Sequence, residues 1–279
     1  MISRSKLARC SKTATSQLRS SARTCSSASP PRLGCEYSLR YTSSFPYPPL
    51  SIPERELEVR RDLRQERIFT IDPATAKDLD DALSVKANDD GTYDIGVHIA
   101  DVSYFVKPNT ALDRDAKKRA TAVYLVQRAV PMLPPTLCEE LCSLNLGKDR
   151  LAFSVIFTMT KEAKVAKKWF GRTVIKSSAQ LSYANAQGVI DGKLLGGIPV
   201  APEHDASAIE HDIKILHEIA QVLRERRFKN GALSTRIPQL TFTLDESGKP
   251  IDCNQSVSED ANALVEEVAY SSLFMPGLD

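Results

Sequence analysis

Alternation of hydrophobic and polar residues predicts a β-rich core in the first half of the chain. Between Tyr93 and Ala100, apolar residues at every second position alternate with polar or small ones. This period of two is typical of a strand with one buried face. Short apolar runs rich in β-branched residues predict four further strands, at 67–71, 82–85, 151–160 and 168–175.

Helical spacing appears in the second half. Apolar residues recur three or four positions apart over 209–223, which predicts an amphipathic helix of about 20 residues, and Asn-Gly at 230–231 is a typical helix end. Thr and Asp at 110 and 113 resemble a capping box at another helix start. A turn signal at 246–248 predicts a β-hairpin. The fold class is therefore α+β, a twisted sheet flanked by helices.

Composition changes along the chain. Residues 1–51 are rich in Ser, Arg and Lys, and Glu36 is their only acidic residue. We expect a disordered basic segment; a mitochondrial transit peptide and a stretch of wrongly predicted coding sequence remain alternatives. The net charge of +2 does not by itself indicate nucleic-acid binding. No apolar run approaches the roughly 20 residues of a membrane span, and six cysteines form neither a disulfide nor a zinc pattern.

Four aspartates, Asp72, Asp78, Asp80 and Asp81, occupy ten residues between two predicted strands. Carboxylates about 4 Å apart repel by roughly 4 kcal/mol per pair at a surface-like dielectric, so such a turn either binds a cation or stays fully solvated. Oxygen ligands favour Mg²⁺ or Mn²⁺. An EF-hand calcium loop does not match, because Leu83 stands where its glycine belongs. The residues alone leave both alternatives open.

Four blocks in order resemble the RNB family, the catalytic domain of ribonuclease II and ribonuclease R type exoribonucleases. They are FTIDPATAKDLDDALSV at 69–85, YDIGVHIADVSYFV at 93–106, the run at 117–159 and RERRFKNGAL at 224–233. The resemblance covers residues 52–267 and implies Mg²⁺-dependent 3′-to-5′ hydrolysis of single-stranded RNA to nucleoside 5′-monophosphates. SIPER and RFKNGAL resemble the eukaryotic cytoplasmic branch and its fungal relatives, which implies a cytoplasmic protein, with mitochondria as the alternative.

The resemblance also implies site residues. In such enzymes the aspartates matching Asp72, Asp78, Asp80 and Asp81 hold magnesium, and manganese is a possible substitute. Asp72 and Asp81 are expected as direct ligands. Asp80, together with Asp78, is expected to serve the cleavage step.

RNA contacts are expected at four further positions. Tyr124 matches an aromatic residue that stacks on the terminal base, and the alternative is an ordinary half-buried strand tyrosine. Phe228 is expected to supply the opposing face, unless it packs inward. Arg227 is either part of a backbone-binding patch or a favourable charge at a helix C-terminus, and Arg150 is either a phosphate contact or a surface charge. His98 is expected to be a core histidine.

The sequence departs from the family pattern at both ends. Residues 268–279 do not resemble the family's continuation, and an arginine-rich segment that contacts phosphate is missing, so the chain looks truncated. We therefore expect weak activity or none from this chain alone. The alternative function is a non-catalytic RNA-binding regulator of messenger RNA translation or decay. The sequence indicates no stable protein partner.

Overall fold

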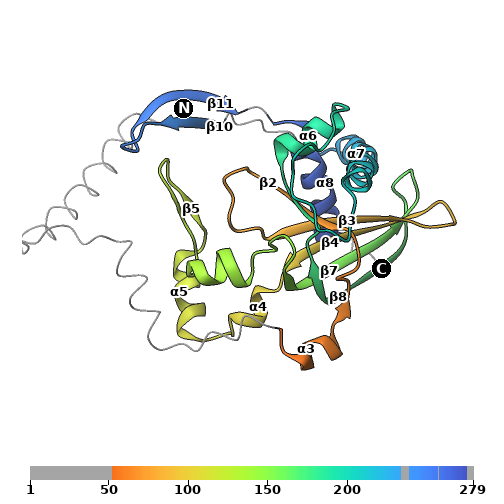
Figure 1. The fold of residues 1–279 in the computed structure, drawn as a ribbon, viewed down its shortest axis with the longest axis horizontal. Helices are drawn as coiled ribbons and strands as arrows, with labels where there is room; N and C mark the ends of the chain where they lie inside the picture. Colours follow the sequence, from red (N-terminus) through yellow and green to blue (C-terminus); the bar gives the residue numbers. More distant parts are fainter. Residues whose placement is uncertain (1–51, 234–238, 257, 275–279) are drawn as a thin grey trace, which may run out of the picture. The chain divides into compact units, whose positions relative to one another are not determined.

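The computed structural model describes residues 52–233, 239–256 and 258–274. The predicted basic segment 1–51, with its transit-peptide alternative, lies outside the described residues, as do residues 275–279. The centre is a seven-stranded sheet of order β1-β8-β7-β4-β3-β2-β9 (Figure 1). Along the chain its strands are β1 (Arg61–Asp62), β2 (Ile68–Asp72), β3 (Asp81–Ala87), β4 (Tyr93–Ala100), β7 (Asp149–Met159), β8 (Val165–Lys176) and β9 (Ala179–Ser182).

The five predicted sheet strands are confirmed as β2, β3, β4, β7 and β8, which pair antiparallel in sequence order. Each follows the preceding strand in space, as short connections favour. The two outer strands were not predicted: β1 pairs parallel with β8, and β9 pairs parallel with β2. Both are short, and their sequences carry little apolar periodicity.

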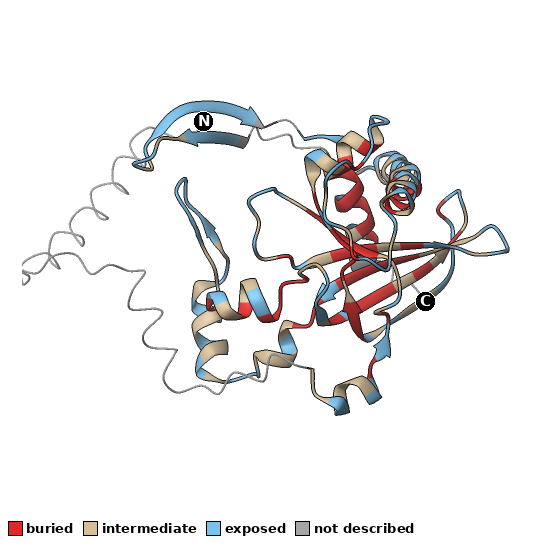
Figure 2. Cartoon of the chain, in the orientation of Figure 1, coloured by how far each residue is buried: buried red, intermediate tan, exposed pale blue. Residues whose placement is uncertain are grey.

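Three helices cover one face of the sheet: α6 (Tyr183–Ile190), α7 (Ala206–Lys229) and α8 (Asp260–Phe274) (Figure 1). The larger core lies between them and the sheet, with side chains such as Phe69, Val97 and Phe157 packed against Ile213 and Leu264. Figure 2 shows the buried residues concentrated along these strands and helices. The α+β class with a sheet flanked by helices is confirmed.

The opposite face carries a smaller core around Leu79, Ala82, Leu144 and Ile175. The short helix α4 (Val102–Phe105) and the π-helix η1 (Thr136–Leu141) border it. The remaining elements are α3 (Glu54–Val59), α5 (Ala111–Arg119) and two hairpins, β5 (Val123–Tyr124) with β6 (Ala129–Val130), and β10 (Gln239–Leu244) with β11 (Pro250–Ser256).

The predicted helix ends are confirmed in detail. The Thr110 hydroxyl accepts a hydrogen bond from the Asp113 N–H at 3.2 Å, which caps α5. Helix α7 ends at its C-cap Asn230, and Gly231 follows with a φ of 94°, which favours glycine. Helix α8 runs to Phe274, so it extends into the segment 268–279 that does not resemble the family's continuation.

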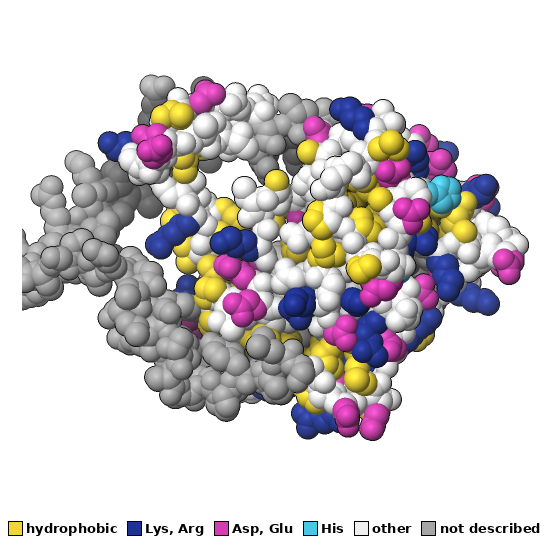
Figure 3. Space-filling model, in the orientation of Figure 1, with side chains coloured by type: hydrophobic (Ala, Val, Ile, Leu, Met, Phe, Trp, Pro, Cys, Tyr) yellow, Lys and Arg dark blue, Asp and Glu magenta, His cyan; other side chains and the backbone are white. Residues whose placement is uncertain are grey.

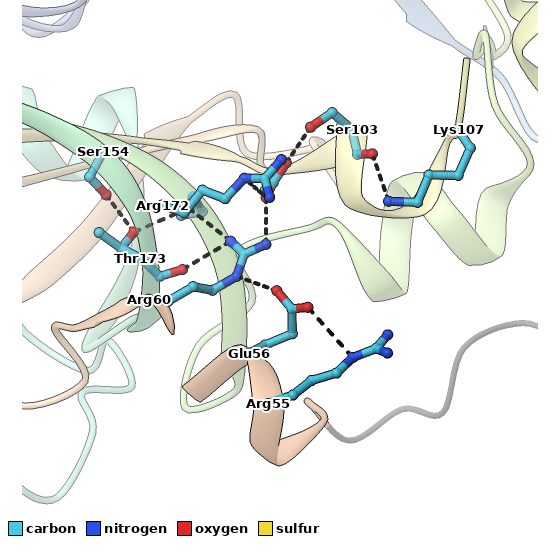
Figure 4. A network of polar contacts seen from close by, with 10 residues as sticks. Arg55, Glu56, Arg60, Ser103, Lys107, Ser154, Arg172 and Thr173 are labelled. Atoms are coloured by element: carbon cyan, nitrogen blue, oxygen red, sulfur yellow. Dashed lines mark hydrogen bonds and ion pairs between the residues drawn. The ribbon is translucent and has the colours of Figure 1, made fainter. Parts of the chain in front are cut away.

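A buried polar network joins α3 to the end of β4 (Figure 4). The Arg60 guanidinium donates to Asp101 at 2.7 Å, and the side chains of both residues are almost fully buried. Ser103 donates to the other Asp101 oxygen at 2.6 Å. A buried charge is tolerated only when it is paired in this way. The pair therefore fixes Asp101, the residue directly after β4.

His98 lies in the core, as predicted. Its ring nitrogens contact the hydroxyls of Ser84 at 2.9 Å and Ser154 at 2.7 Å. Burial lowers the pKa of His98 to about 3, so the ring stays neutral. A Cβ on Gly96 would come within 2.6 Å of the ring, which explains the glycine.

The described surface has mixed charge. Figure 3 shows basic and acidic side chains interspersed on the visible face, which fits the small net charge. Within the described part of the chain, no helix combines the length and apolar character required to cross a bilayer.

Candidate active site

The four aspartates lie on one connection, residues 72–81, which we call the acidic loop. Asp72 is the last residue of β2 and Asp81 the first of β3. These strands pair with each other, with Phe69 opposite Leu83. Because the two strands are antiparallel, the C-terminal end of β2 and the N-terminal end of β3 lie at the same end of the strand pair. Asp78 and Asp80 lie on the segment between them.

The loop is anchored through its backbone. Leu79, which stands between Asp78 and Asp80, is fully buried in the smaller core. The Leu144 N–H donates to the Leu79 carbonyl and the Ala100 N–H to the Asp80 carbonyl, both at 2.9 Å. Since Leu79 points inward, the extended alternation directs its two aspartate neighbours outward.

The carboxyl groups influence one another. The pKa of Asp72 is raised to about 7, first by burial and then by the negative charges of Asp81, Asp80 and Asp78. The pKa of Asp80 is also raised, by desolvation from surrounding protein and by Asp78 and Asp81, although its side chain is largely exposed. Burial raises the pKa of Asp81. All four carboxyl groups therefore belong to one electrostatic cluster.

Among the described residues, no lysine, arginine or histidine pairs with this cluster. The Asp72 Oδ2 atom and the Thr70 hydroxyl are both buried without a hydrogen-bond partner of normal geometry, although Thr70 lies close enough to Asp72 to lower its pKa slightly against the effect of burial. Buried polar atoms are rarely left unpaired. Oxygen donors with excess negative charge and an unpaired buried oxygen fit a hard divalent cation.

The donors are not preassembled into a compact cage. Among the described residues, no three His, Cys, Asp or Glu side chains stand close enough to form a ligand set. This differs from the expected site in which four aspartates together hold the ion. Magnesium typically binds through one or two carboxylates and completes its shell with water and substrate phosphate. An open arrangement of carboxylates is compatible with that mode of binding.

Tyr183 is a neighbour of the site that the sequence analysis missed. It is the first residue of α6 and follows Ser182, which pairs with Asp72 across β9 and β2. Burial raises the pKa of Tyr183, and the charges of Asp72 and Asp81 raise it further. The Ser182–Asn185 capping box was the available sequence signal for this helix start. Its position next to the acidic loop depends on the unpredicted strand β9.

Two thiols lie near the loop without forming a redox pair. Cys138 and Cys142 are both free. Burial raises the pKa of Cys138 to about 11 and that of Cys142 to about 12. Protonated, partly or fully buried thiols are poor nucleophiles and metal ligands, so both cysteines behave as small hydrophobic residues.

Tyr124 lies on the β5–β6 hairpin with 77% of its surface exposed. The alternative of a half-buried strand tyrosine is therefore wrong. Its neighbours Val123, Leu125 and Val126 are also at least 45% exposed, so the hairpin presents a small apolar surface. An exposed aromatic face of this kind is suited to stacking on a base.

Phe228 and Arg227 occupy the C-terminal turn of α7. Phe228 is 36% exposed and lies against the guanidinium groups of Arg224 and Arg227, at 5.8 and 5.2 Å from its ring centre. Arg227 also forms ion pairs with Glu266 and the buried Glu267 of α8. Arg227 is thus held by two carboxylates and joins α7 to α8, and its expected contact with the RNA backbone stays a prediction.

Arg150 also has contacts within the protein. Its guanidinium donates to the Ser143 carbonyl at 2.8 Å and to the Asp149 carbonyl at 3.0 Å. Burial lowers its pKa. Arg150 is therefore not an ordinary surface charge; it braces the segment before β7, and its expected contact with phosphate stays a prediction.

A metal-free titration tests the electrostatics of the loop. Because the folded-state pKa of Asp72 is about 7 and its unfolded value about 3.9, the folded chain binds the extra proton between these values. Its stability must then fall as the pH rises from about 4 to 7. We expect Asp72→Asn to stabilise the chain in EDTA by about 1–2 kcal/mol at pH 8, allowing for solvent screening, and little at pH 4.

Urea unfolding at both pH values measures this difference. Asp89→Asn is the matched control, since Asp89 is an exposed aspartate in the next turn. An Asp72→Asn variant that is less stable than the wild-type chain at pH 8 would contradict the proposed burial of an unbalanced charge.

Comparison with known proteins agrees with the resemblance found in the sequence. The family model described as the RNB domain matches residues 60–271, four residues beyond the predicted boundary at 267. The DIS3-like exonuclease 2 of Schizosaccharomyces pombe is 53% identical over 220 residues, which cover 77% of this chain and 24% of that protein. The inactive exonuclease DIS3L2 of Arabidopsis thaliana is 46% identical over 231 residues, covering 81% of this chain and 22% of that protein.

A solved structure shares the fold. Ribonuclease R of Mycoplasma genitalium, in complex with ribose-methylated single-stranded RNA, matches with a TM-score of 0.71 and 27% identity. The match covers 78% of this chain and 33% of that one. The chain thus spans about a quarter of the length of the curated relatives described above.

Proposed function

The chain belongs to the RNB family of exoribonucleases, and on that premise we propose that it forms the metal-binding part of a 3′-to-5′ exoribonuclease. Its substrate is single-stranded RNA, its products are nucleoside 5′-monophosphates, and its cofactor is Mg²⁺, which Mn²⁺ can replace. The observation that carries this proposal is the acidic loop, whose four carboxylates form no ion pair with any lysine, arginine or histidine that the structure describes.

The four aspartates of the acidic loop have different roles. Asp72 is placed by the pairing of β2 with β9 and Asp81 by the pairing of β3 with β4, so they are the better-fixed ligands. Asp78 and Asp80 project from the segment anchored by Leu79 and face the phosphate. A bound divalent cation supplies positive charge that offsets the charge of the phosphate and lowers the pKa of nearby water. Without it, the carboxylates would repel the RNA backbone.

RNA is held by stacking as well as by charge. The exposed ring of Tyr124 stacks on a base near the 3′ end. Stacking accepts any base, because every base has a π-face. This tolerance suits an enzyme that degrades RNA one nucleotide after another without regard to sequence.

Replacing Tyr124 by alanine is expected to weaken binding of single-stranded RNA by roughly 1–3 kcal/mol, about 5- to 150-fold in Kd. The loss should be similar for oligo(A) and oligo(U). Fluorescence anisotropy in EDTA measures binding without cleavage. Tyr124→Phe should retain affinity, and Leu125→Ala tests the same hairpin without removing an aromatic ring. Equal losses in Tyr124→Ala and Leu125→Ala would argue against stacking.

A second candidate function is RNA binding without catalysis. The similarity to a relative named as inactive favours it. Overall sequence identity does not distinguish active relatives from inactive ones. The four aspartates of the acidic loop favour the enzyme, since a binding module needs no cluster of mutually repelling carboxylates. Both functions share Tyr124, so only a cleavage measurement distinguishes them.

The test uses one RNA oligonucleotide carrying a label at either end. With Mg²⁺, the 5′-labelled RNA should shorten progressively, while the 3′-labelled RNA should release labelled mononucleotide at once. EDTA should abolish both. Because only weak activity is expected from this chain alone, the assay runs to long incubation times with Asp80→Asn as the baseline. Retained RNA binding with no shortening beyond that baseline would contradict the enzymatic proposal for this chain and favour the binding function.

A further inference from the structure

One buried hydroxyl, that of Ser143, is hydrogen-bonded to the backbone of the acidic loop. Ser143 lies between η1 and β7 and is fully buried. Its hydroxyl donates a hydrogen bond to the Lys77 carbonyl at 2.9 Å and accepts one from the Leu79 N–H at 3.1 Å. These two backbone groups flank Asp78 on either side. One oxygen atom thus spans the peptide units that carry this aspartate.

The segment that carries Ser143 is itself fixed. Arg150 donates to the Ser143 carbonyl at 2.8 Å, and the next residue, Leu144, donates its N–H to the Leu79 carbonyl at 2.9 Å. Leu144 is fully buried and packs in the same small core as Leu79. The backbone that carries the Ser143 hydroxyl is therefore held in place by the rest of the fold.

We propose that Ser143 is a positioning residue that sets the direction of Asp78 and Asp80 toward the divalent cation. The inference rests on the proposed function. A hydroxyl suits this role because it donates one hydrogen bond and accepts others at the same atom. Alanine at this position would leave both the Lys77 carbonyl and the Leu79 N–H without their partner, and the loop would lose two of its backbone anchors.

A buried serine can also serve stability alone, and the chain offers a matched control for that role. Ser178 is fully buried, and its hydroxyl donates to the Ile68 carbonyl at 2.7 Å, at the far end of β2 from Asp72. Ser178→Ala removes a comparable buried hydrogen bond without touching the acidic loop. It should lower the melting temperature, but by less than Ser143→Ala, which removes two hydrogen bonds.

The experiment titrates the full chain with Mn²⁺ and follows free and bound ion by electron paramagnetic resonance, without RNA. Replacing a residue that supports metal ligands through hydrogen bonds typically lowers metal affinity about 10- to 100-fold. We expect Ser143→Ala to weaken Mn²⁺ binding about 10-fold and to alter the bound spectrum, while Ser178→Ala leaves both unchanged. Ser143→Cys keeps the side-chain size but hydrogen-bonds weakly, and it provides the same comparison if the alanine variant fails to fold.

The outcomes separate this inference from the proposed function. Absence of Mn²⁺ binding by the wild-type chain would overturn the proposed function and this inference with it. Wild-type binding that Ser143→Ala leaves unchanged would overturn only the role of Ser143. Equal weakening in Ser143→Ala and Ser178→Ala would reduce the effect to lost stability and would also overturn it.

Discussion

Asp80→Asn is expected to lower Mg²⁺-dependent RNA shortening by at least about 100-fold, the usual scale for losing one charged group that acts on the transition state. The amide keeps the size of the carboxylate but removes its negative charge, so the cation near the scissile phosphate is held less well. Asp80 is largely exposed, and its side chain makes no described ion pair. The fold should therefore survive the change. Gel assays of a 5′-labelled RNA measure the rate.

Binding must be measured beside cutting. RNA affinity in EDTA should not fall in Asp80→Asn, because the variant removes a negative charge that repels phosphate. Asp89→Asn provides the control for a similar substitution in the neighbouring turn and should cut at the wild-type rate. Equal cutting by Asp80→Asn and the wild-type chain would remove Asp80 from the cleavage step.

The second large effect concerns stability. Arg60→Ala leaves Asp101 buried without its main partner, and breaking a buried ion pair from one side typically costs about 3–5 kcal/mol. Burial alone would raise the pKa of Asp101, but Ser103 and Arg60 outweigh it and hold that pKa below its ordinary value. The loss should also disturb the acidic loop, since the Ala100 N–H, one residue before Asp101, holds the Asp80 carbonyl. Urea unfolding at neutral pH measures the effect.

Arg64→Ala is the matched control for this prediction. Arg64 pairs with Asp62 and Asp149, both exposed, and surface pairs contribute only about 0–1 kcal/mol. The double variant Arg60→Ala with Asp101→Ala should recover part of the loss, because no unpaired charge stays buried. If Arg60→Ala and Arg64→Ala destabilise the chain equally, the buried pair has no special role.

Local patterns predicted the central strands and the long helix because each has a strong period. β4 alternates over eight residues, and α7 keeps an apolar stripe through most of its 24 residues. β1 and β9 escaped prediction because two- and four-residue strands are defined by their partners, here β8 and β2, and by no pattern of their own. The position of Tyr183 next to the acidic loop could not be predicted for the same reason, because it depends on the pairing of β9 with β2.

The sequence predicted which residues form the candidate site. It could not predict the contacts that these residues make. Four aspartates in one turn are visible in the sequence, and their coupling follows from proximity alone. The intramolecular contacts of Arg150 and Arg227 could not be predicted either. Only the fold shows that Arg150 donates to the Ser143 carbonyl and that Arg227 pairs with Glu267.

The most direct test is a crystal of the chain soaked in Mn²⁺ and measured at the manganese absorption edge. We predict an anomalous peak beside β2 and β3, about 2–2.5 Å from carboxylate oxygens of the acidic loop, with Asp72 and Asp81 among the ligands. A well-ordered loop without such a peak, or manganese bound only elsewhere, would contradict the account.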